Sequence, residues 1–352
     1  MPIEYLDLPA DREIDISVLT PVLNEEAHIR DTVASMVRQE FDGEIEFIFV
    51  DGRSEDRTVA ILEELAADDP RIRVLDNPDR TTAFGLNVGL AAARGRYVAR
   101  MDGHASYPPS YLADGVRRLG AGDVVWVAGP QLPRGDGVWS RRVAMALETG
   151  LASIGSKRWG DASSDGEVEL DTGVFTGVWP RSVLDDHGGW DSGFPINQDS
   201  ELAARVLAAG QRIVQLPSMG AGYVPRNSLR SLARQYYRYG LYRGKTARLH
   251  ANSLRRSHLL GPGLVLAVGG ALVLPRPLRS LARAAVASYV LALIAASARA
   301  ALESPDRAGD AATLPVVFVV MHGAWGSGFI VSGFKHGPPL GALARVAGLG
   351  GS

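Results

Sequence analysis

The sequence predicts an α/β domain followed by a helical membrane region. From Ile14 to about Leu216, short β-branched runs alternate with stretches of helical periodicity, which is the pattern of βαβ units around a largely parallel sheet. Residues 226–256 then carry nine Lys and Arg side chains and no acidic one, and three apolar segments follow. These changes predict an α/β domain at 1–225, a basic interface segment at 226–258 and apolar helices at 259–352.

Five short runs are the expected strands, and each is nearly all apolar, as in strands that helices cover on both faces. They are Ile16–Leu23, Ile45–Val50, Ile72–Leu75, Tyr97–Met101 and Val124–Ala128. Between the first four strands, apolar residues recur at three- and four-residue spacing, which predicts helices. These helices are expected over Glu25–Arg38, Thr58–Ala67 and Thr82–Ala93.

The net charge of −2 hides two oppositely charged halves. Residues 1–225 hold 36 acidic and 21 basic side chains (net −15), and residues 226–352 hold 3 and 16 (net +13). Because the chain has no Cys, disulfide scaffolds, zinc-thiolate sites, iron–sulfur clusters and thiol nucleophiles are excluded. The acidic N-terminus lacks the basic and then apolar pattern of a secretory signal, so we expect the α/β domain in the cytoplasm.

The basic segment is amphipathic, because Leu and Tyr residues lie between its cations. This pattern is typical of an element that faces anionic lipid, where each cation contributes about 1 kcal/mol. A solvated helix or a nucleic-acid-binding helix has the same composition. We expect no nucleic-acid partner, because apolar segments of membrane length follow directly.

The three apolar segments are Leu259–Leu274, Ala284–Ala298 and Ala311–Phe334. The last has 24 residues without a formal charge, more than the roughly 20 that cross a bilayer, and is predicted to be transmembrane. The second is long enough if Arg299 extends to the headgroups, and the first is shorter and rich in Gly. Buried core helices are the alternative for these two segments.

Charge bias predicts a membrane topology. The connection at 274–284 carries three arginines, whereas the next connection carries Glu303, Asp306, Arg307 and Asp310. By the positive-inside rule the arginine-rich connection lies in the cytoplasm with the basic segment. We therefore expect the second and third segments to form a hairpin, with the acidic loop outside the cell and Lys335 inside, and the first segment to be re-entrant or interfacial.

Polar clusters follow the first two predicted strands, at Thr20–Glu26 and Val50–Asp56. Open α/β sheets bind ligands at the carboxyl ends of their parallel strands, where a carboxylate such as Asp51 can accept hydrogen bonds from a nucleobase or ribose. Helix capping by Asn24 and Ser54 is the alternative interpretation. The sequence has no GxGxxG or GxxxxGK[ST] motif, which disfavours a dinucleotide fold or a P-loop.

Two further clusters carry candidate catalytic groups. Asp102-Gly103-His104 follows the fourth strand, and its carboxylate and imidazole suit a divalent cation that bridges a diphosphate, with the imidazole favouring Mn²⁺ over Mg²⁺. Asp199 lies at the start of an amphipathic helix, whose dipole favours the ionised form, so it can act as a general base. The alternatives are a turn Asp with a surface His, and a helix carboxylate that serves stability alone.

In this order, the motifs resemble the inverting family 2 glycosyltransferases with a GT-A fold over residues 14–240. The matching residues are Pro21, Asn24 and Glu25, then Asp51 and Arg53, then Asp102 and His104, then Gln198 and Asp199, and finally Gln235, Arg238 and Tyr239. The DxH triplet and the three apolar segments look most like the membrane-associated succinoglycan-biosynthesis branch. Its members extend lipid-linked sugars at the inner membrane.

The resemblance implies a role for each matching residue. Asp199 is the catalytic base, and Asp102 and His104 hold Mn²⁺ or Mg²⁺. Asp102 also belongs to the donor site, together with Pro21, Asn24, Glu25, Asp51, Arg53 and Arg238. Gln198, Gln235 and Tyr239 form the acceptor rim. The implied donor is a UDP-hexose, and the implied acceptor is a polyprenyl-diphosphate-linked sugar or a glycan at the cytoplasmic face of the inner membrane.

Three departures from the family pattern leave a second function open. His104 replaces the second Asp of DxD, Gln198 replaces the Glu of the ED pair, and Tyr239 replaces the Trp of QxxRW. These changes favour a membrane-anchored, non-catalytic scaffold that binds nucleotide sugars on the same fold. A nucleotidyltransferase is disfavoured, because it needs a basic, Gly-rich loop where Pro21–Glu26 is acidic.

Overall fold

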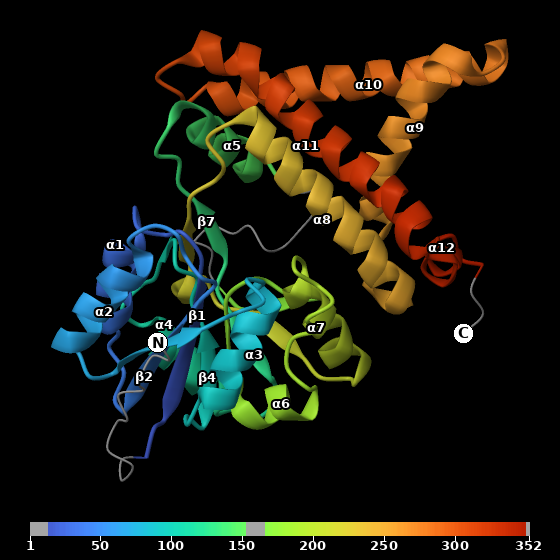
Figure 1. Ribbon diagram of the computed structural model, residues 1–352. Coiled ribbons are helices and arrows are strands. Elements are labelled where there is room, and N and C mark those ends of the chain that lie inside the picture. The colour runs from blue at the N-terminus through green and yellow to red at the C-terminus, as the bar shows by residue number, and fades with distance from the viewer. Residues whose placement is uncertain (1–12, 153–165, 350–352) are drawn as a thin grey trace. The chain divides into compact units, whose positions relative to one another are not determined.

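The computed structural model describes residues 13–152 and 166–349 and divides into two compact units. The α/β unit comprises Met1–Leu132 and Gly160–Tyr223, and the helical unit comprises Pro133–Trp159 and Val224–Ser352 (Figure 1). In the sequence, the first segment of the helical unit, Pro133–Trp159, therefore comes between the two segments of the α/β unit.

The α/β unit is built on an eight-stranded sheet of order β3-β2-β1-β4-β9-β6-β10-β8. The first four strands in this order are parallel, β9 is antiparallel to both β4 and β6, β10 is parallel to β6, and β8 is antiparallel at the edge. The strands are β1 (Ile16–Val22), β2 (Ile45–Asp51), β3 (Ile72–Asp76), β4 (Tyr97–Arg100), β6 (Trp126–Ala128), β8 (Val168–Leu170), β9 (Gly177–Pro180) and β10 (Ile213–Gln215).

Alternate side chains of the central strands enter two separate cores, as the two-residue period of a strand requires. On β2, Phe47 and Phe49 join one core and Ile48 and Val50 join the other, and all four are fully buried. The first core includes residues of α1 (Ile29–Val37), α2 (Thr58–Asp68) and α4 (Tyr111–Leu119), and the second includes residues of α3 (Thr82–Ala92), α6 (Arg181–Asp186) and α7 (Gln198–Ala208). Helices therefore cover both faces of the sheet (Figure 1).

The five predicted strands and three predicted helices are confirmed to within a few residues, and so is the α/β class. The sequence did not indicate β9, which separates the parallel strands β4 and β6. It also did not indicate a small sheet of order β5-β11-β7, formed by Ala105–Ser106, Ala221–Tyr223 and Gln131–Pro133. These strands have two to four residues, too few for a periodic pattern to reveal them.

The helical unit contains α5 (Val138–Glu148), α8 (Leu229–Leu249), α9 (Leu260–Val273), α10 (Arg276–Ala301), α11 (Arg307–His336) and α12 (Leu340–Val346). Helices α8 and α11 pack at close range through glycines. A Cβ at Gly240 would lie 1.9 Å from the Trp325 carbonyl oxygen, and one at Gly244 would lie 2.5 Å from the Ser332 side chain. Residue numbers rise together along the two helices, which therefore run parallel.

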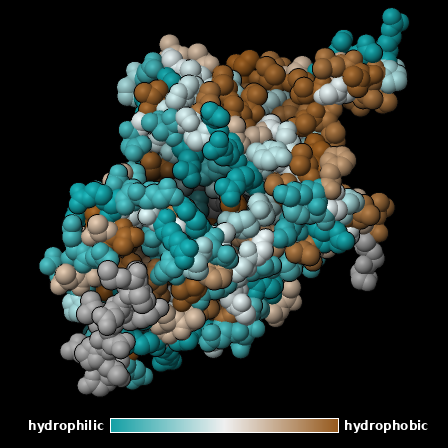
Figure 2. Space-filling model, in the orientation of Figure 1, coloured by the Kyte–Doolittle hydropathy of each residue, from teal (hydrophilic) through white to brown (hydrophobic). Residues whose placement is uncertain are grey.

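Among the described residues, three helical stretches are long and apolar enough to cross a membrane: Arg256–Val273, Arg276–Ala301 and Arg307–His336. Each contains one of the three apolar segments identified in the sequence, except that the first stretch ends one residue before its segment does, so the predicted C-terminal helical region is confirmed. Large apolar side chains are exposed on α9 and α10, among them Leu272, Val273, Leu281 and Leu291. Figure 2 shows this apolar surface over the C-terminal helices.

Candidate active site

The parallel strands bring three of the predicted motifs to one edge of the sheet. Strand β1 pairs with β2 so that Val22 lies opposite Asp51, and with β4 so that Leu19 lies opposite Arg100. The residues that follow these strands, Leu23–Glu26, Gly52–Asp56 and Met101–His104, therefore leave the sheet side by side.

The loops after β1 and β2 are cross-linked by side chains. The Asn24 amide nitrogen donates to Ser54 Oγ at 2.8 Å, and the Glu55 amide nitrogen donates to Asn24 Oδ1 at 2.8 Å. Neither Asn24 nor Ser54 is a helix N-cap; those positions belong to His28 and Arg57. The capping alternative is therefore wrong, and the two side chains instead fix the shape of the loops.

Asp51 organises the second loop from a buried position, with 6% of its surface exposed. Its carboxylate accepts hydrogen bonds from the Ser54 amide nitrogen at 3.0 Å and from Ser54 Oγ at 2.6 Å. Arg53, in a left-handed conformation (φ 59°), turns away to an exposed ion pair with Asp76 at 3.1 Å, which raises the pKa of its guanidinium. Asp51 is thus held rigidly at the loop base, whereas Arg53 lies toward β3.

Asp102 is held by a buried arginine that the sequence analysis missed. Arg100, 4% exposed, donates from Nε to Asp102 Oδ1 at 2.8 Å and from Nη2 to Oδ2 at 3.2 Å. The Asp102 amide nitrogen donates to the Tyr107 hydroxyl at 2.6 Å. The sequence feature that could have revealed this pair is the position of the arginine, two residues before Asp102 in an otherwise apolar strand. An arginine in such a strand is buried, and a buried cation needs an anionic partner.

The charge of Arg100 also interacts with Asp199. Burial alone would lower the pKa of Arg100, but the charge and hydrogen bonds of Asp102 and the charge of Asp199 outweigh it, and the pKa is raised. Arg100 therefore remains a cation that is hydrogen-bonded to Asp102 and interacts with the charge of Asp199, which lies in a separate part of the sequence. Its Nη1 atom is buried and has no hydrogen-bond partner among residues 13–152 and 166–349.

His104 and Glu25 connect the first and third motifs. His104 Nδ1 lies 3.1 Å from Glu25 Oε1, and the His104 side chain is 40% exposed. A carboxylate on one ring nitrogen is the usual partner of a histidine that binds a metal through the other nitrogen. Glu25 thus fixes the orientation of the His104 ring, and metal binding by His104 together with Asp102 stays a prediction.

The donor chemistry at Asp102 and His104 fits a divalent cation. Each oxygen of Asp102 keeps a second lone pair after it accepts from Arg100. Within the described part of the chain, no three His, Asp or Glu side chains form a complete metal site. Mg²⁺ and Mn²⁺ are commonly bound by one or two protein ligands and completed by substrate phosphates, so a two-residue site is sufficient.

Asp199 is the second residue of α7 and follows a buried glutamine. Its neighbour Gln198 is 6% exposed, and Asn197 takes a left-handed conformation (φ 69°) just before the helix. Gly173 allows close approach from the opposite side, because a Cβ there would lie 2.3 Å from the Asp199 carbonyl oxygen. The Asp199 side chain is half-buried, and its charge interacts with that of Arg100.

The remaining predicted residues lie on α8 of the helical unit. Gln235 Nε2 donates to the Tyr239 hydroxyl at 3.0 Å, and Tyr239 packs edge-on against Tyr236 at 5.7 Å between ring centroids. Arg238 is exposed on the same helix. Gln235 and Tyr239 thus form one polar and aromatic surface, and their contact with the donor site stays a prediction.

Comparison with known proteins identifies the α/β unit. The sequence model of Glycosyl transferase family 2 matches residues 17–177. The chain carries a family 2 glycosyltransferase domain. This match includes Pro21 through His104 and ends before Asp199.

The succinoglycan biosynthesis protein ExoA of Rhizobium meliloti is 29% identical over 324 residues, covering 89% of this chain and 93% of ExoA. ExoO of the same organism is 27% identical over 217 residues, or 61% of each chain. The similarity to ExoA therefore extends over both units of this chain.

Solved structures show the same fold. The mannosyltransferase PcManGT from Pyrobaculum calidifontis, solved with GDP-Man and Mn²⁺, superposes with a TM-score of 0.57 over 90% of each chain at 22% identity. Residues 1–349 of S. aureus TarS, solved with UDP, give a TM-score of 0.50 over 92% of each chain at 15% identity. The predicted GT-A fold is confirmed.

Proposed function

We propose that this protein is an inverting, metal-dependent glycosyltransferase of polysaccharide biosynthesis. It moves a sugar, in our proposal from a UDP-hexose, to a lipid-linked or glycan acceptor at the cytoplasmic face of the membrane. The observation that carries the proposal is Arg100, which joins the DxH carboxylate of Asp102 to the charge of Asp199. The similarity to ExoA over both units supports the role in polysaccharide biosynthesis.

The donor site is formed by the strand-end loops. Asp51 lies at the base of a loop that Asn24 and Ser54 hold rigid, which suits hydrogen bonds to a ribose or nucleobase. Because these loops are already fixed, donor binding costs little ordering entropy. Structural neighbours were solved with different nucleotides, GDP-Man in one case and UDP-GlcNAc in another, so the uracil base rests on the resemblance to the family alone.

Asp102 and His104 would hold the divalent cation beside the donor diphosphate. When bound there, Mn²⁺ or Mg²⁺ neutralises the charge that develops on the departing nucleoside diphosphate. Arg100 keeps the Asp102 carboxylate in one orientation, and Glu25 does the same for the His104 ring. Arg238 on α8 supplies a further positive charge to the leaving group in this proposal.

Asp199 acts as the base. Its carboxylate takes the proton from an acceptor hydroxyl, whose oxygen forms the new bond to the anomeric carbon as the bond to the diphosphate breaks. Attack from the side opposite the leaving group inverts the anomeric configuration. Gln198, Gln235 and Tyr239 form the acceptor rim, where the Tyr239 ring offers an apolar face to a sugar.

The helical unit supports a site close to the bilayer. The exposed apolar side chains of α9 and α10 would enter the membrane, and α8 would present its cations to anionic headgroups. A polyprenyl-diphosphate-linked acceptor would then meet the active site at a raised effective concentration.

A donor panel tests the proposal. Protein in detergent is incubated with UDP- and GDP-sugars, Mn²⁺ or Mg²⁺ and a lipid-linked sugar acceptor, and nucleoside-diphosphate release is measured. We expect release that requires metal and acceptor and is confined to few donors. Donor binding without release, over a broad acceptor set, would favour the non-catalytic scaffold.

A further inference from the structure

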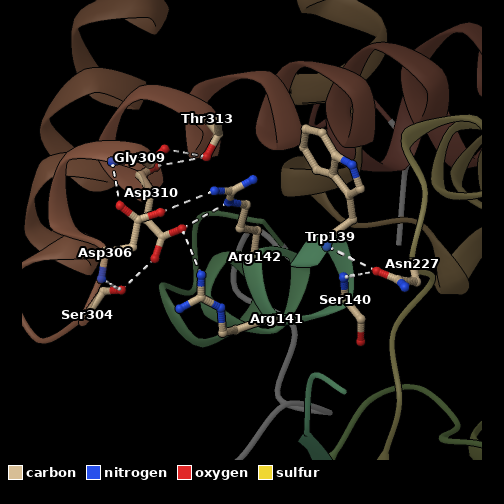
Figure 3. A network of polar contacts seen from close by, with 10 residues as sticks. All are labelled: Trp139, Ser140, Arg141, Arg142, Asn227, Ser304, Asp306, Gly309, Asp310 and Thr313. Atoms are coloured by element: carbon tan, nitrogen blue, oxygen red, sulfur yellow. Dashed lines mark hydrogen bonds and ion pairs between the residues drawn. The ribbon is translucent and has the colours of Figure 1, made fainter. Parts of the chain in front are cut away.

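The N-terminus of α11 is bound to α5 by a buried polar network (Figure 3). The side chain of Asp310 is fully buried and accepts hydrogen bonds from Arg142 Nε at 2.9 Å and Arg141 Nη2 at 3.4 Å. Ser304, just before α11, donates to the other oxygen of Asp310. Asp310, and also Asp306 through a 3.5 Å contact with Arg142, are therefore paired with arginines of α5.

The start of α8 is bound to the same helix. The amide nitrogens of Trp139 and Ser140, in the first turn of α5, donate to Asn227 Oδ1 at 3.0 and 3.1 Å (Figure 3). Asn227 lies two residues before α8. The beginnings of α5, α8 and α11 thus meet at one end of the helical unit.

Chain length determines on which side of a membrane this meeting point lies. Strand β7 ends at Pro133 and α5 begins at Val138, and β11 ends at Tyr223 and α8 begins at Leu229. Four or five extended residues span at most about 18 Å, whereas the hydrocarbon core is about 30 Å thick. The network around Asp310 must therefore lie on the same side of the membrane as the α/β unit.

Packing against α8 then constrains the rest of α11. The two helices are parallel and in close contact at Gly240 and Gly244. Helix α8 carries six Lys and Arg residues in 21, and each costs about 2.5–3.5 kcal/mol at the centre of a membrane-spanning helix. A helix of this charge does not cross the bilayer, and α11 lies along it. Accordingly, 44% of an 18-residue apolar stretch of α11 is buried, whereas only 17% of the corresponding stretch of α10 is buried.

We propose that α11 does not span the membrane and that the connection between α10 and α11, residues 302–306, lies on the side of the α/β unit. Membrane contact then rests on α9 and α10, whose apolar side chains are exposed. This replaces the transmembrane hairpin expected from charge bias and apolar length. Charge bias and apolar length do not take into account that Asp306 and Asp310 are paired with arginines of α5, or that α11 packs on α8.

Cysteine labelling tests the proposal directly, because the natural chain has no Cys. The exposed connection residues Glu303 and Pro305 are each changed to Cys, and the exposed Glu63 on α2 is changed to Cys as a marker of the α/β unit. Right-side-out and inside-out membrane vesicles are treated with a membrane-impermeant maleimide. An exported single-cysteine protein marks the outer face, and labelling in detergent verifies that each thiol is reactive.

We expect Glu303→Cys and Pro305→Cys to label only in those vesicles in which Glu63→Cys labels. Labelling of either connection residue in the vesicles in which Glu63→Cys stays unlabelled would overturn the proposal. Failure of both to label in the vesicles in which Glu63→Cys labels, while both react in detergent, would overturn it as well. The assay needs no enzymatic activity, so its outcome is independent of the proposed function.

Discussion

Arg100 and Asp102, two residues apart at the end of β4, are joined by two hydrogen bonds, and the charge of Arg100 also interacts with Asp199 on α7. This buried arginine fixes the carboxylate that holds the metal in our proposal, and its charge acts on the proposed base. Its planar guanidinium fixes the orientation of Asp102 as a single ammonium group cannot.

Replacement of Arg100 tests this positioning role. We expect Arg100→Lys to lower kcat/KM by about 100-fold, mostly through kcat, because misplacement of catalytic groups by about 1 Å has effects of this size. Arg100→Gln leaves the Asp102 charge without its partner, so it should lose more activity and unfold more easily, by about 3–5 kcal/mol. Initial rates and thermal unfolding measure both effects. Equal activities of the Lys and Gln variants would argue that Arg100 serves stability alone.

The identity of residue 104 should set metal preference. We expect His104→Asp, which restores the DxD triplet, to shift activity from Mn²⁺ toward Mg²⁺, because an all-oxygen ligand set suits the harder ion. The ratio of initial rates with the two ions at saturation measures this shift. His187→Asp, which changes a histidine outside the strand-end cluster, is the matched control. An unchanged ratio in His104→Asp would remove His104 from the metal site.

Acid unfolding should report on Asp123. Its hydrogen bond with Arg118, at 2.6 Å, lowers the pKa of this carboxyl from 3.8 to about 2 in the folded protein. Since the folded pKa is depressed, its stabilising effect is complete above about pH 4 and is lost as the pH falls toward 2. Asp123→Asn should therefore flatten the pH dependence of unfolding in this window. The exposed Asp79→Asn serves as control, and the same slope in both variants would contradict the prediction.

Close packing of α8 and α11 should make Gly240 intolerant of a side chain. A Cβ at Gly240 meets the Trp325 carbonyl oxygen at 1.9 Å, whereas one at Gly323 on α11 meets nothing within 4 Å. We expect Gly240→Ala to destabilise the protein by about 1–3 kcal/mol and Gly323→Ala to be neutral or slightly stabilising. Thermal unfolding in detergent compares them. Equal melting temperatures would contradict the packing of the two helices.

Periodicity was sufficient for the sheet and its flanking helices, because β1, β2 and α1 to α3 have long, regular apolar patterns. The motifs also placed Asn24, Asp51 and Asp102 at one edge of the sheet. Arg100 was missed because a charged residue at a strand end is inconspicuous until its burial is known. Length and composition predict that α11 crosses the membrane, and α11 is indeed long and apolar enough to do so. Our proposal that it does not cross rests on its packing against α8 and α5, which length and composition do not reveal.

The most direct test of the central claim is acceptor-dependent release of nucleoside diphosphate by Asp199→Asn, with donor binding measured on the same sample. Asp186→Asn, an exposed carboxylate on α6, is the matched control. We predict that Asp199→Asn loses about 10²- to 10⁴-fold in rate while its donor affinity and that of the control remain at the wild-type level. Release at the wild-type rate by Asp199→Asn would contradict the assignment of Asp199 as the base and the mechanism built on it.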